Sequence, residues 1–127
     1  MEPLTILIVD DEEDLAFTLA ERLTLRGFRA EAVTSAIDAL QCLSKEKFGV
    51  VVLDVKMPGI DGLHLMAEIR QKYHTLPVIL LTGHGSATDA ERGMRAGAFD
   101  YLMKPIDIET LVEKIKRSIG PEKGERL

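Results

Sequence analysis

Residues 7–15, LIVDDEEDL, form the junction in the sequence that most restricts the fold. An apolar run of Leu, Ile and Val stops at Asp10, and four further acids occupy the next four positions. Continuous apolar runs of this kind are typical of strands that are buried on both faces, as in parallel sheets. The adjacent carboxylates of Asp10 and Asp11 repel each other, so we expect other groups in the folded chain to hold them.

Length and composition predict one folded domain. The chain has 127 residues, 46% of them hydrophobic and 29% charged, so it can bury a substantial core. Apolar periodicity is lost near the end, and we therefore expect a domain over residues 1–120 and a tail or linker stub over residues 121–127. A net charge of −5 does not favour direct binding to nucleic acid.

Three features of the sequence favour the cytoplasm. The first residues include acids where a secretory signal would be basic. No apolar run approaches the roughly 20 residues of a membrane span, so we expect no membrane partner. The single cysteine, Cys42, cannot form an internal disulfide; it stands among leucines, which predicts packing in or near the core and is consistent with a reducing compartment.

Five apolar segments recur along the chain, with helical patterns between them. We predict strands at residues 5–10, 28–33, 49–54, 77–82 and 99–104. The second of these alternates, with Arg29 and Glu31 on one side, which is typical of an edge strand. Helical spacing and capping residues predict five helices: one carrying Leu15, Leu19 and Leu23, one starting at Ser35 with Asp38, two spanning 62–72 and 86–95, and one starting at Asp107.

Two of the predicted helices have informative details. Gly27 follows the first helix and is expected to cap its carboxyl end, with Phe28 folding back. The helix at 86–95 starts with Ser86 and Asp89 but has a thin apolar face made by Ala87, Ala90 and Met94. We expect such a helix to be held weakly.

Alternation of strand and helix predicts an α/β fold of the (βα)5 type. This is a doubly wound, five-stranded parallel sheet in the flavodoxin-like order 2-1-3-4-5, with helices on both faces. Open sheets of this kind bind ligands outside the carboxyl ends of the strands, where strand order reverses. The predicted strand ends carry Asp10 with Asp11, then Asp54, Thr82 and Lys104.

The strand ends would therefore bring three carboxylates, a hydroxyl and an ammonium together at one edge of the sheet, which we call the mouth of the site. Three crowded carboxylates need a cation to stay ionised. Because no His or Cys is expected among them, the cluster suits a hard cation that prefers oxygen ligands, and we expect Mg²⁺ in preference to Ca²⁺. Mg²⁺ and Lys104 could together hold the oxygens of a phosphoryl group, Thr82 could donate a hydrogen bond to it, and a carboxylate held in line could attack it.

Each of these residues also has an ordinary structural interpretation. A strand-terminal Asp often caps the following helix, Thr82 alone is a normal β-branched strand end, and Lys104 alone is a normal surface lysine. What favours a functional site is that all of them fall at the ends of predicted strands 1, 3, 4 and 5.

Four motifs carry a resemblance to a known family: VDDE, LDVKMPGIDG, LTGHG and GAFDYLMKP. Over residues 4–119 the chain resembles the receiver domains of two-component response regulators. The resemblance implies a phosphorylation-activated signalling switch, with Asp54 accepting the phosphoryl group of a histidine kinase. It implies no enzyme in the usual sense, at most self-catalysed transfer to Asp54 and hydrolysis from it.

The resemblance also assigns roles to the other site residues. Asp11 would bind Mg²⁺ directly and Asp10 through water, and Asp54 and the backbone carbonyl of Lys56 would complete the protein ligands. Thr82 and Lys104 would contact the phosphoryl group, Lys104–Pro105 would be a cis peptide, and Tyr101 would be the switch aromatic. The fourth helix, fifth strand and fifth helix would form the surface read by a downstream effector domain or protein, or by a second copy of the chain on phosphorylation.

Two alternatives remain open from the sequence. One is a Mg²⁺-dependent phosphatase or phosphotransferase with an aspartyl-phosphate intermediate, although the acid pair is adjacent rather than D-x-D and there is no cap domain. The other is a binding module whose acids only hold metal. The chain itself contains no output domain, so it would act alone or belong to a longer regulator or hybrid kinase. His64 and His74 are expected at the surface, and His84 in an exposed loop near the mouth.

Overall fold

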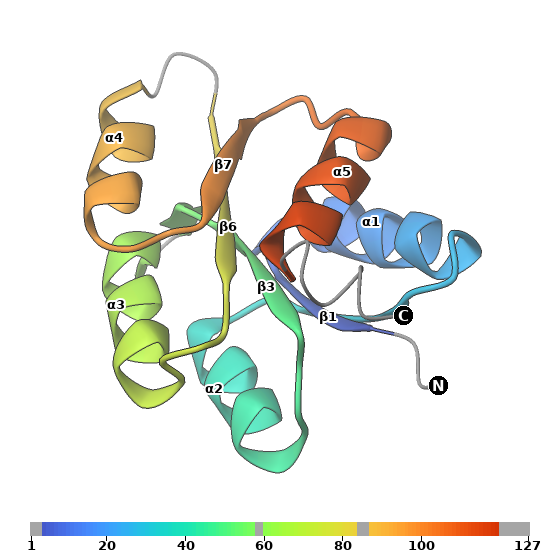
Figure 1. Cartoon of the computed structure of the whole chain (residues 1–127), viewed down its shortest axis with the longest axis horizontal. Coiled ribbons are helices and arrows are strands. Elements are labelled where there is room, and N and C mark those ends of the chain that lie inside the picture. The colour runs from blue at the N-terminus through green and yellow to red at the C-terminus, as the bar shows by residue number, and fades with distance from the viewer. Residues whose placement is uncertain (1–3, 58–59, 84–86, 120–127) are drawn as a thin grey trace.

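Five parallel strands form one sheet in the order β2-β1-β3-β6-β7 (Figure 1), which confirms the predicted topology. The computed structural model describes residues 4–57, 60–83 and 87–119. Within them β1 is the neighbour of both β2 and β3, so the strand order reverses beside β1. The strands are β1 Thr5–Val9, β2 Arg29–Val33, β3 Val50–Asp54, β6 Val78–Thr82 and β7 Asp100–Met103.

Helices cover both faces of this sheet. In Figure 1, α1 and α5 lie together on one face, and α2, α3 and α4 lie on the other. The strand β2 is at an edge, and its Arg29 and Glu31 are exposed, as the alternating pattern predicted. The helices are α1 Glu13–Leu25, α2 Ala36–Lys45, α3 Gly62–Lys72, α4 Ala87–Arg95 and α5 Ile108–Ser118.

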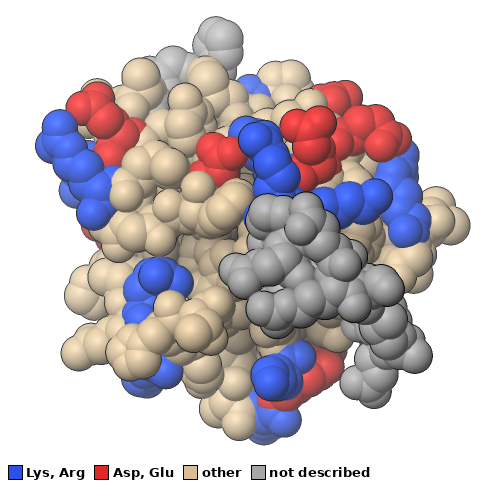
Figure 2. Space-filling model, viewed as in Figure 1, with Lys and Arg blue, Asp and Glu red and all other residues tan. Residues whose placement is uncertain are grey.

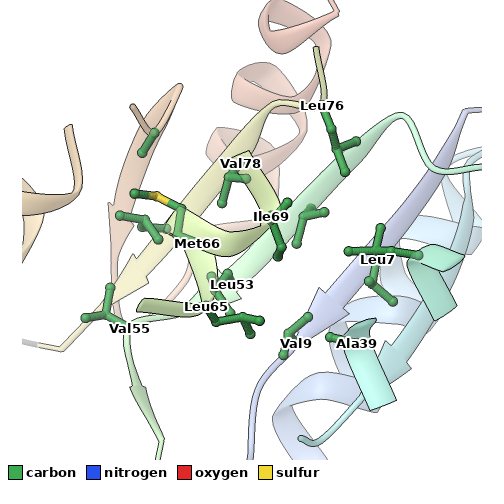
Figure 3. Close-up of a cluster of buried hydrophobic side chains, with 14 of the residues drawn as sticks. Leu7, Val9, Ala39, Leu53, Val55, Leu65, Met66, Ile69, Leu76 and Val78 are labelled. Carbon is green, nitrogen blue, oxygen red and sulfur yellow. The ribbon is translucent and has the colours of Figure 1, made fainter. Parts of the chain in front are cut away.

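Side chains of each central strand alternate between two separate cores. In β1, Ile6 and Ile8 join the core under α1 and α5, whereas Leu7 and Val9 join the core under α2 and α3. Figure 3 shows the second core, where Leu7 and Val9 lie among residues of β3, β6, α2 and α3. Strands buried on both faces explain why the sequence shows continuous apolar runs instead of alternation.

Local signals set the helix ends. The amide of Phe28 donates to the carbonyl of Leu23, and Gly27 has φ of 95°, so α1 ends as its glycine predicted. The Ser35 hydroxyl accepts a hydrogen bond from the amide of Asp38 at the start of α2. Side chains of Asp61 and Asp107 cap α3 and α5 in the same manner.

A small element between β3 and α3 was not predicted. Lys56–Met57 (β4) pairs antiparallel with Ile60–Asp61 (β5) in a two-residue ladder. Pro58 and Gly59, between the two strands of the ladder, lie outside the described residues. Gly62 follows the ladder, and a Cβ at this position would lie 2.3 Å from the carbonyl oxygen of Val55 and 2.5 Å from that of Asp54. The first turn of α3 therefore rests directly on the backbone beside Asp54.

The helix α4 is thinly anchored, as predicted. Its buried residues are Ala90 and Gly93, and a Cβ on Gly93 would meet a methyl group of Leu80 in β6. Met94 is exposed. The predicted start at Ser86, the loop residue His84 and the tail 121–127 lie outside the described residues.

The surface of the described residues carries charges of both signs and two of the three histidines. On the face shown in Figure 2, the Lys and Arg side chains of the described residues are scattered, several of them beside acids, and they do not gather into one large basic patch. His64 and His74 are exposed, and Cys42 is partly buried against the core under α2 and α3. Among the helices that the structure describes, none has the length and apolar character needed to cross a membrane.

Candidate functional site

Successive side chains of a strand point to opposite faces of the sheet, and this alternation decides which side chains at the strand ends meet. Asp10 and Asp54 continue the alternation of Ile8 and Val52, which puts both carboxylates on the α1/α5 face of the sheet. Lys104 comes two residues after Leu102, whose side chain packs on that face, so Lys104 points to the α1/α5 face as well. The Thr82 side chain points to the opposite face, and Thr82 pairs in register with Met103. The carboxylates and the ammonium of the mouth therefore lie on one face of the sheet, which we call its ionic side, and the hydroxyl of Thr82 lies on the other face.

Asp10, Asp11 and Asp54 form an acidic cluster, as predicted. One carboxylate oxygen of each lies within 4.8 Å of the others. Asp10 has no exposed surface and Asp54 is 4% exposed, whereas Asp11 is the most accessible of the three. All the donors are oxygens, which are the ligands that Mg²⁺ and Ca²⁺ prefer.

Asp10 also makes a local hydrogen bond just before the following helix. Its Oδ1 accepts a hydrogen bond of 3.0 Å from the amide of Glu12, the residue that precedes α1. Its Oδ2 is buried and has no directed hydrogen bond. One oxygen is thus used by the fold, and the other is available to a cation.

Lys104 supplies the positive charge of the mouth. Its Nζ lies 3.1 Å from Asp10 Oδ2 and 3.6 Å from Asp54 Oδ2. A third carboxylate, which the sequence analysis did not single out, is nearest: Glu12 Oε1 accepts a hydrogen bond from Nζ at 2.9 Å. Burial acts to lower the pKa of Lys104, but the bonds to Glu12 and Asp10 outweigh it and raise the pKa to about 12. The Lys104–Pro105 peptide is cis, as the resemblance implied.

Asp54 is the carboxylate whose ionisation the site changes most. Burial first, and then the negative charge of Asp10, raise the pKa of Asp54 to about 7 in the protein without metal. Lys104 and the backbone amide of Lys56 act in the opposite direction. A cation that neutralises Asp10 would remove the effect of that negative charge and favour the ionised form of Asp54.

Thr82 presents a buried hydroxyl without a partner. The residue is 1% exposed, and its Oγ1 makes no hydrogen bond within the described protein. Unsatisfied buried hydroxyls are uncommon and costly, so this atom is suited to a ligand oxygen that arrives from outside. Tyr101 is 38% exposed on the same side of the sheet. It lines a pocket of about 330 Å³ with Met103 and with Ala87, Ala90, Glu91 and Met94 of α4.

Lys56 links Asp54 to α4. Its backbone amide bonds to Asp54, and its Nζ lies 3.6 Å from Asp89 Oδ2 in the first turn of α4. The ladder β4–β5 pairs Lys56 with Asp61 and so fixes its backbone. Its carbonyl oxygen is the group that the resemblance assigned to the metal.

Known proteins are similar to this chain in sequence. The family model described as "Response regulator receiver domain" matches residues 6–116. The response regulator protein FleR of Pseudomonas aeruginosa is 42% identical over 112 residues, which are 88% of this chain and 24% of FleR. The DNA-binding transcriptional regulator NtrC of Proteus hauseri is 37% identical over 119 residues, which are 94% of this chain and 25% of NtrC. The chain thus spans about a quarter of the length of these relatives.

Solved structures give the same result for the fold. A response regulator receiver domain protein from Clostridium thermocellum has a TM-score of 0.88 and 31% identity, and the match covers 94% of this chain and 97% of that one. The similarity therefore extends over nearly all of both chains.

Proposed function

Because this chain belongs to the family of response regulator receiver domains, which act in phosphorylation-dependent signalling, we propose that Asp54 is its phospho-acceptor. The observation that carries this assignment is the position of Asp54 at the end of β3. There it is buried beside Asp10, with an ammonium group 3.6 Å from its Oδ2. Asp10 is buried beside the same lysine, but its Oδ1 accepts a hydrogen bond from the amide of Glu12, which favours Asp54 as the acceptor.

The proposed reaction is a single displacement at phosphorus. A carboxylate oxygen of Asp54 attacks the phosphoryl group, a new P–O bond forms, and the P–N bond to the histidine of a kinase breaks. The electron pair of that bond leaves with the imidazole. Lys104 offsets the charge that the transferred group brings, and the Thr82 hydroxyl donates to one of its oxygens.

The acidic cluster fits a magnesium ion. Asp11 would bind it directly, Asp10 through water, and Asp54 and the backbone carbonyl of Lys56 would complete the protein ligands. The all-oxygen donor set of the cluster, with one oxygen of each carboxylate within 4.8 Å of the others, supports this choice. When bound, Mg²⁺ supplies positive charge that neutralises the carboxylates and the phosphoryl oxygens.

The response is proposed to pass from Thr82 to the surface of α4, β7 and α5. Thr82 moves toward the phosphoryl oxygen and leaves space on the side of α4, and Tyr101 turns inward to fill it. The amphipathic phenol of Tyr101 can occupy either place at modest cost. The small buried face of α4 allows the helix to shift. An effector domain, an effector protein or a second copy of the chain would then read the altered surface.

The wider role is proposed from the relatives. FleR and NtrC are a response regulator and a DNA-binding transcriptional regulator about four times as long as the matched segment. We propose that a cytoplasmic histidine kinase phosphorylates this domain and that an effector transmits the signal. The alternative of a turnover phosphatase is not favoured, because the relatives are response regulators that act in signalling.

Labelling at Asp54 tests the proposal. With Mg²⁺ and a small phosphoryl donor such as acetyl phosphate, intact-mass spectrometry should show one added phosphoryl group. Asp54→Asn should remove it, because an amide is nearly isosteric but a poor nucleophile. Asp61→Asn is the matched control, since this carboxylate caps α3 outside the cluster, and labelling should persist. A label that survives in Asp54→Asn would refute the acceptor, and repeated turnover of a phosphate ester would restore the phosphatase alternative.

A further inference from the structure

Glu12 is the nearest carboxylate to Lys104, and the proposed reaction gives it no role. We infer that Glu12 is a positioning residue that holds the ammonium of Lys104 in the unphosphorylated protein and thereby slows phosphorylation of Asp54. The inference rests on the proposed function of Asp54. It concerns the rate at which the site can accept a phosphoryl group, not the identity of the acceptor.

The three distances around Lys104 Nζ define its resting position. Glu12 Oε1 is at 2.9 Å and Asp10 Oδ2 at 3.1 Å, whereas Asp54 Oδ2 is at 3.6 Å. The ammonium therefore lies closer to the acids at the start of α1 than to the acceptor. The Lys104 side chain is 19% exposed, so the contact lies at the rim of the mouth rather than in bulk solvent.

The Glu12 carboxylate has no other task that the structure shows. Glu12 precedes α1, yet its side chain makes no capping hydrogen bond. Its own amide is satisfied by Asp10, so the fold does not require the carboxylate. At 63% side-chain exposure it can leave Lys104 and enter water at little cost. A removable partner of this kind suits a group that must change partners during a reaction.

Phosphorylation requires that exchange. The new phosphoryl group brings about −1.5 to −2 charge to Asp54, and Lys104 is the described cation beside that carboxylate. An ammonium shared with Glu12 is only partly available to the incoming group. Release from Glu12 must therefore precede or accompany the approach of the donor, and its cost is added to the barrier.

The effect should be modest, because one partner is exposed. Exposed ion pairs are weak, so we expect Glu12→Gln to accelerate labelling of Asp54 by roughly two- to fivefold. The glutamine keeps the length of the side chain and its helix propensity, and only the charge is lost.

A neighbouring acid separates positioning from simple charge repulsion. Glu13 lies in the first turn of α1, carries the same charge and makes no described contact with Lys104. Glu13→Gln removes an equal charge from the same region, so it reproduces any long-range effect on an anionic donor. Labelling of both variants with acetyl phosphate at saturating Mg²⁺ should show acceleration in Glu12→Gln and a rate near wild type in Glu13→Gln.

A second measurement tests the contact without phosphorylation. In the metal-free protein, the side-chain ¹³Cε–¹H NMR signal of Lys104 should shift in Glu12→Gln and stay in place in Glu13→Gln. Equal acceleration in the two variants, no acceleration in Glu12→Gln, or an unmoved Lys104 signal would each overturn the inference while Asp54 remained the acceptor. Absence of label at Asp54 in the wild-type protein would instead remove the proposed function, and the inference with it.

Discussion

The backbone amide of Lys104 donates a hydrogen bond of 2.8 Å to the carbonyl oxygen of Thr82. The two residues are far apart in the sequence but adjacent across β6 and β7. Their side chains nevertheless point to opposite faces of the sheet. Lys104 joins Asp10 on the ionic side of the mouth, and Thr82 shares the side of Met103, Tyr101 and α4. A phosphoryl group bound by both side chains, as we propose, would contact residues on both faces of the sheet.

The first prediction concerns Asp11. Asp11→Ala should weaken Mg²⁺ binding by at least about tenfold, because a direct ligand is lost. It should also stabilise the metal-free protein by up to about 1 kcal/mol, since one charge of a repelling cluster is removed. Isothermal titration calorimetry and urea unfolding in EDTA measure the two effects. Asp14→Ala is the control, because this acid lies in α1 outside the cluster; destabilisation by Asp11→Ala would contradict the crowding argument.

The second prediction concerns pH. The pKa of Asp54 is raised from 3.8 to about 7 in the folded, metal-free protein. Between these values the folded state keeps a proton that the unfolded state releases, so this stabilisation is complete below about pH 4 and is lost as pH rises toward 7. The slope for one proton is at most about 1.4 kcal/mol per pH unit.

Urea unfolding in EDTA at several pH values checks this dependence. The difference in unfolding free energy between wild type and Asp54→Asn should fall with rising pH, because the amide cannot titrate. Saturating Mg²⁺ should reduce the pH dependence, since the ion favours the charged carboxylate. A difference that stays constant across the range would show that Asp54 is not perturbed.

The third prediction concerns Thr82. In Thr82→Ala the protein should still be phosphorylated at Asp54, but the response at the far surface should shrink. NMR spectra with and without a beryllofluoride phosphoryl mimic should show large changes at Tyr101 and residues 87–95 in wild type and smaller ones in the variant. Thr75→Ala, an exposed threonine before β6, should respond like wild type. Changes confined to the strand ends in wild type would refute the proposed path to α4.

Thr82→Ala should also cost little stability in the unphosphorylated protein. The hydroxyl that it removes is buried without a partner, so its loss relieves a desolvation penalty. We expect a change within about 1 kcal/mol of wild type by urea unfolding. A large loss would mean that Oγ1 makes a stabilising bond in solution.

The fourth prediction compares two glycines. Gly62→Ala should destabilise the protein by about 2 kcal/mol or more, because its Cβ would press on two backbone carbonyls that cannot move freely. Gly93→Ala should cost less, since its Cβ meets the end of the Leu80 side chain and alanine favours the helix by roughly 1 kcal/mol. Thermal unfolding of both variants measures the difference, and equal losses would contradict the assigned contacts.

Much of this architecture could be predicted from residue patterns. The predicted strands include β1, β3 and β6, because continuous runs of Val, Ile and Leu identify buried strands. The predicted helix 62–72 agrees with α3. The meeting of Asp10, Asp54 and Lys104 also followed from strand order, since parallel strands end at one edge. These predictions depend on periodicity and topology, which the sequence carries directly.

The parts that were missed depend on other information. The ladder β4–β5 has two residues on each side, too few to show a period. The bond from Lys104 to Glu12 depends on which of five consecutive acids turns toward the mouth, and spacing alone does not select one. The separation of Thr82 from Lys104 onto opposite faces needed the register of β6 and β7.

Strand order also has a consequence for synthesis on the ribosome. Asp10, Asp11 and Asp54 can meet once β3 has emerged and paired with β1, and the chain must then still add α3, β6, α4 and β7 before Lys104 appears. The chain emerges from the ribosome amino end first, at about 5–20 residues per second. A nascent intermediate that ends before β7 therefore carries the three carboxylates without their lysine, and we expect cellular Mg²⁺ to act as a folding counter-ion at that stage.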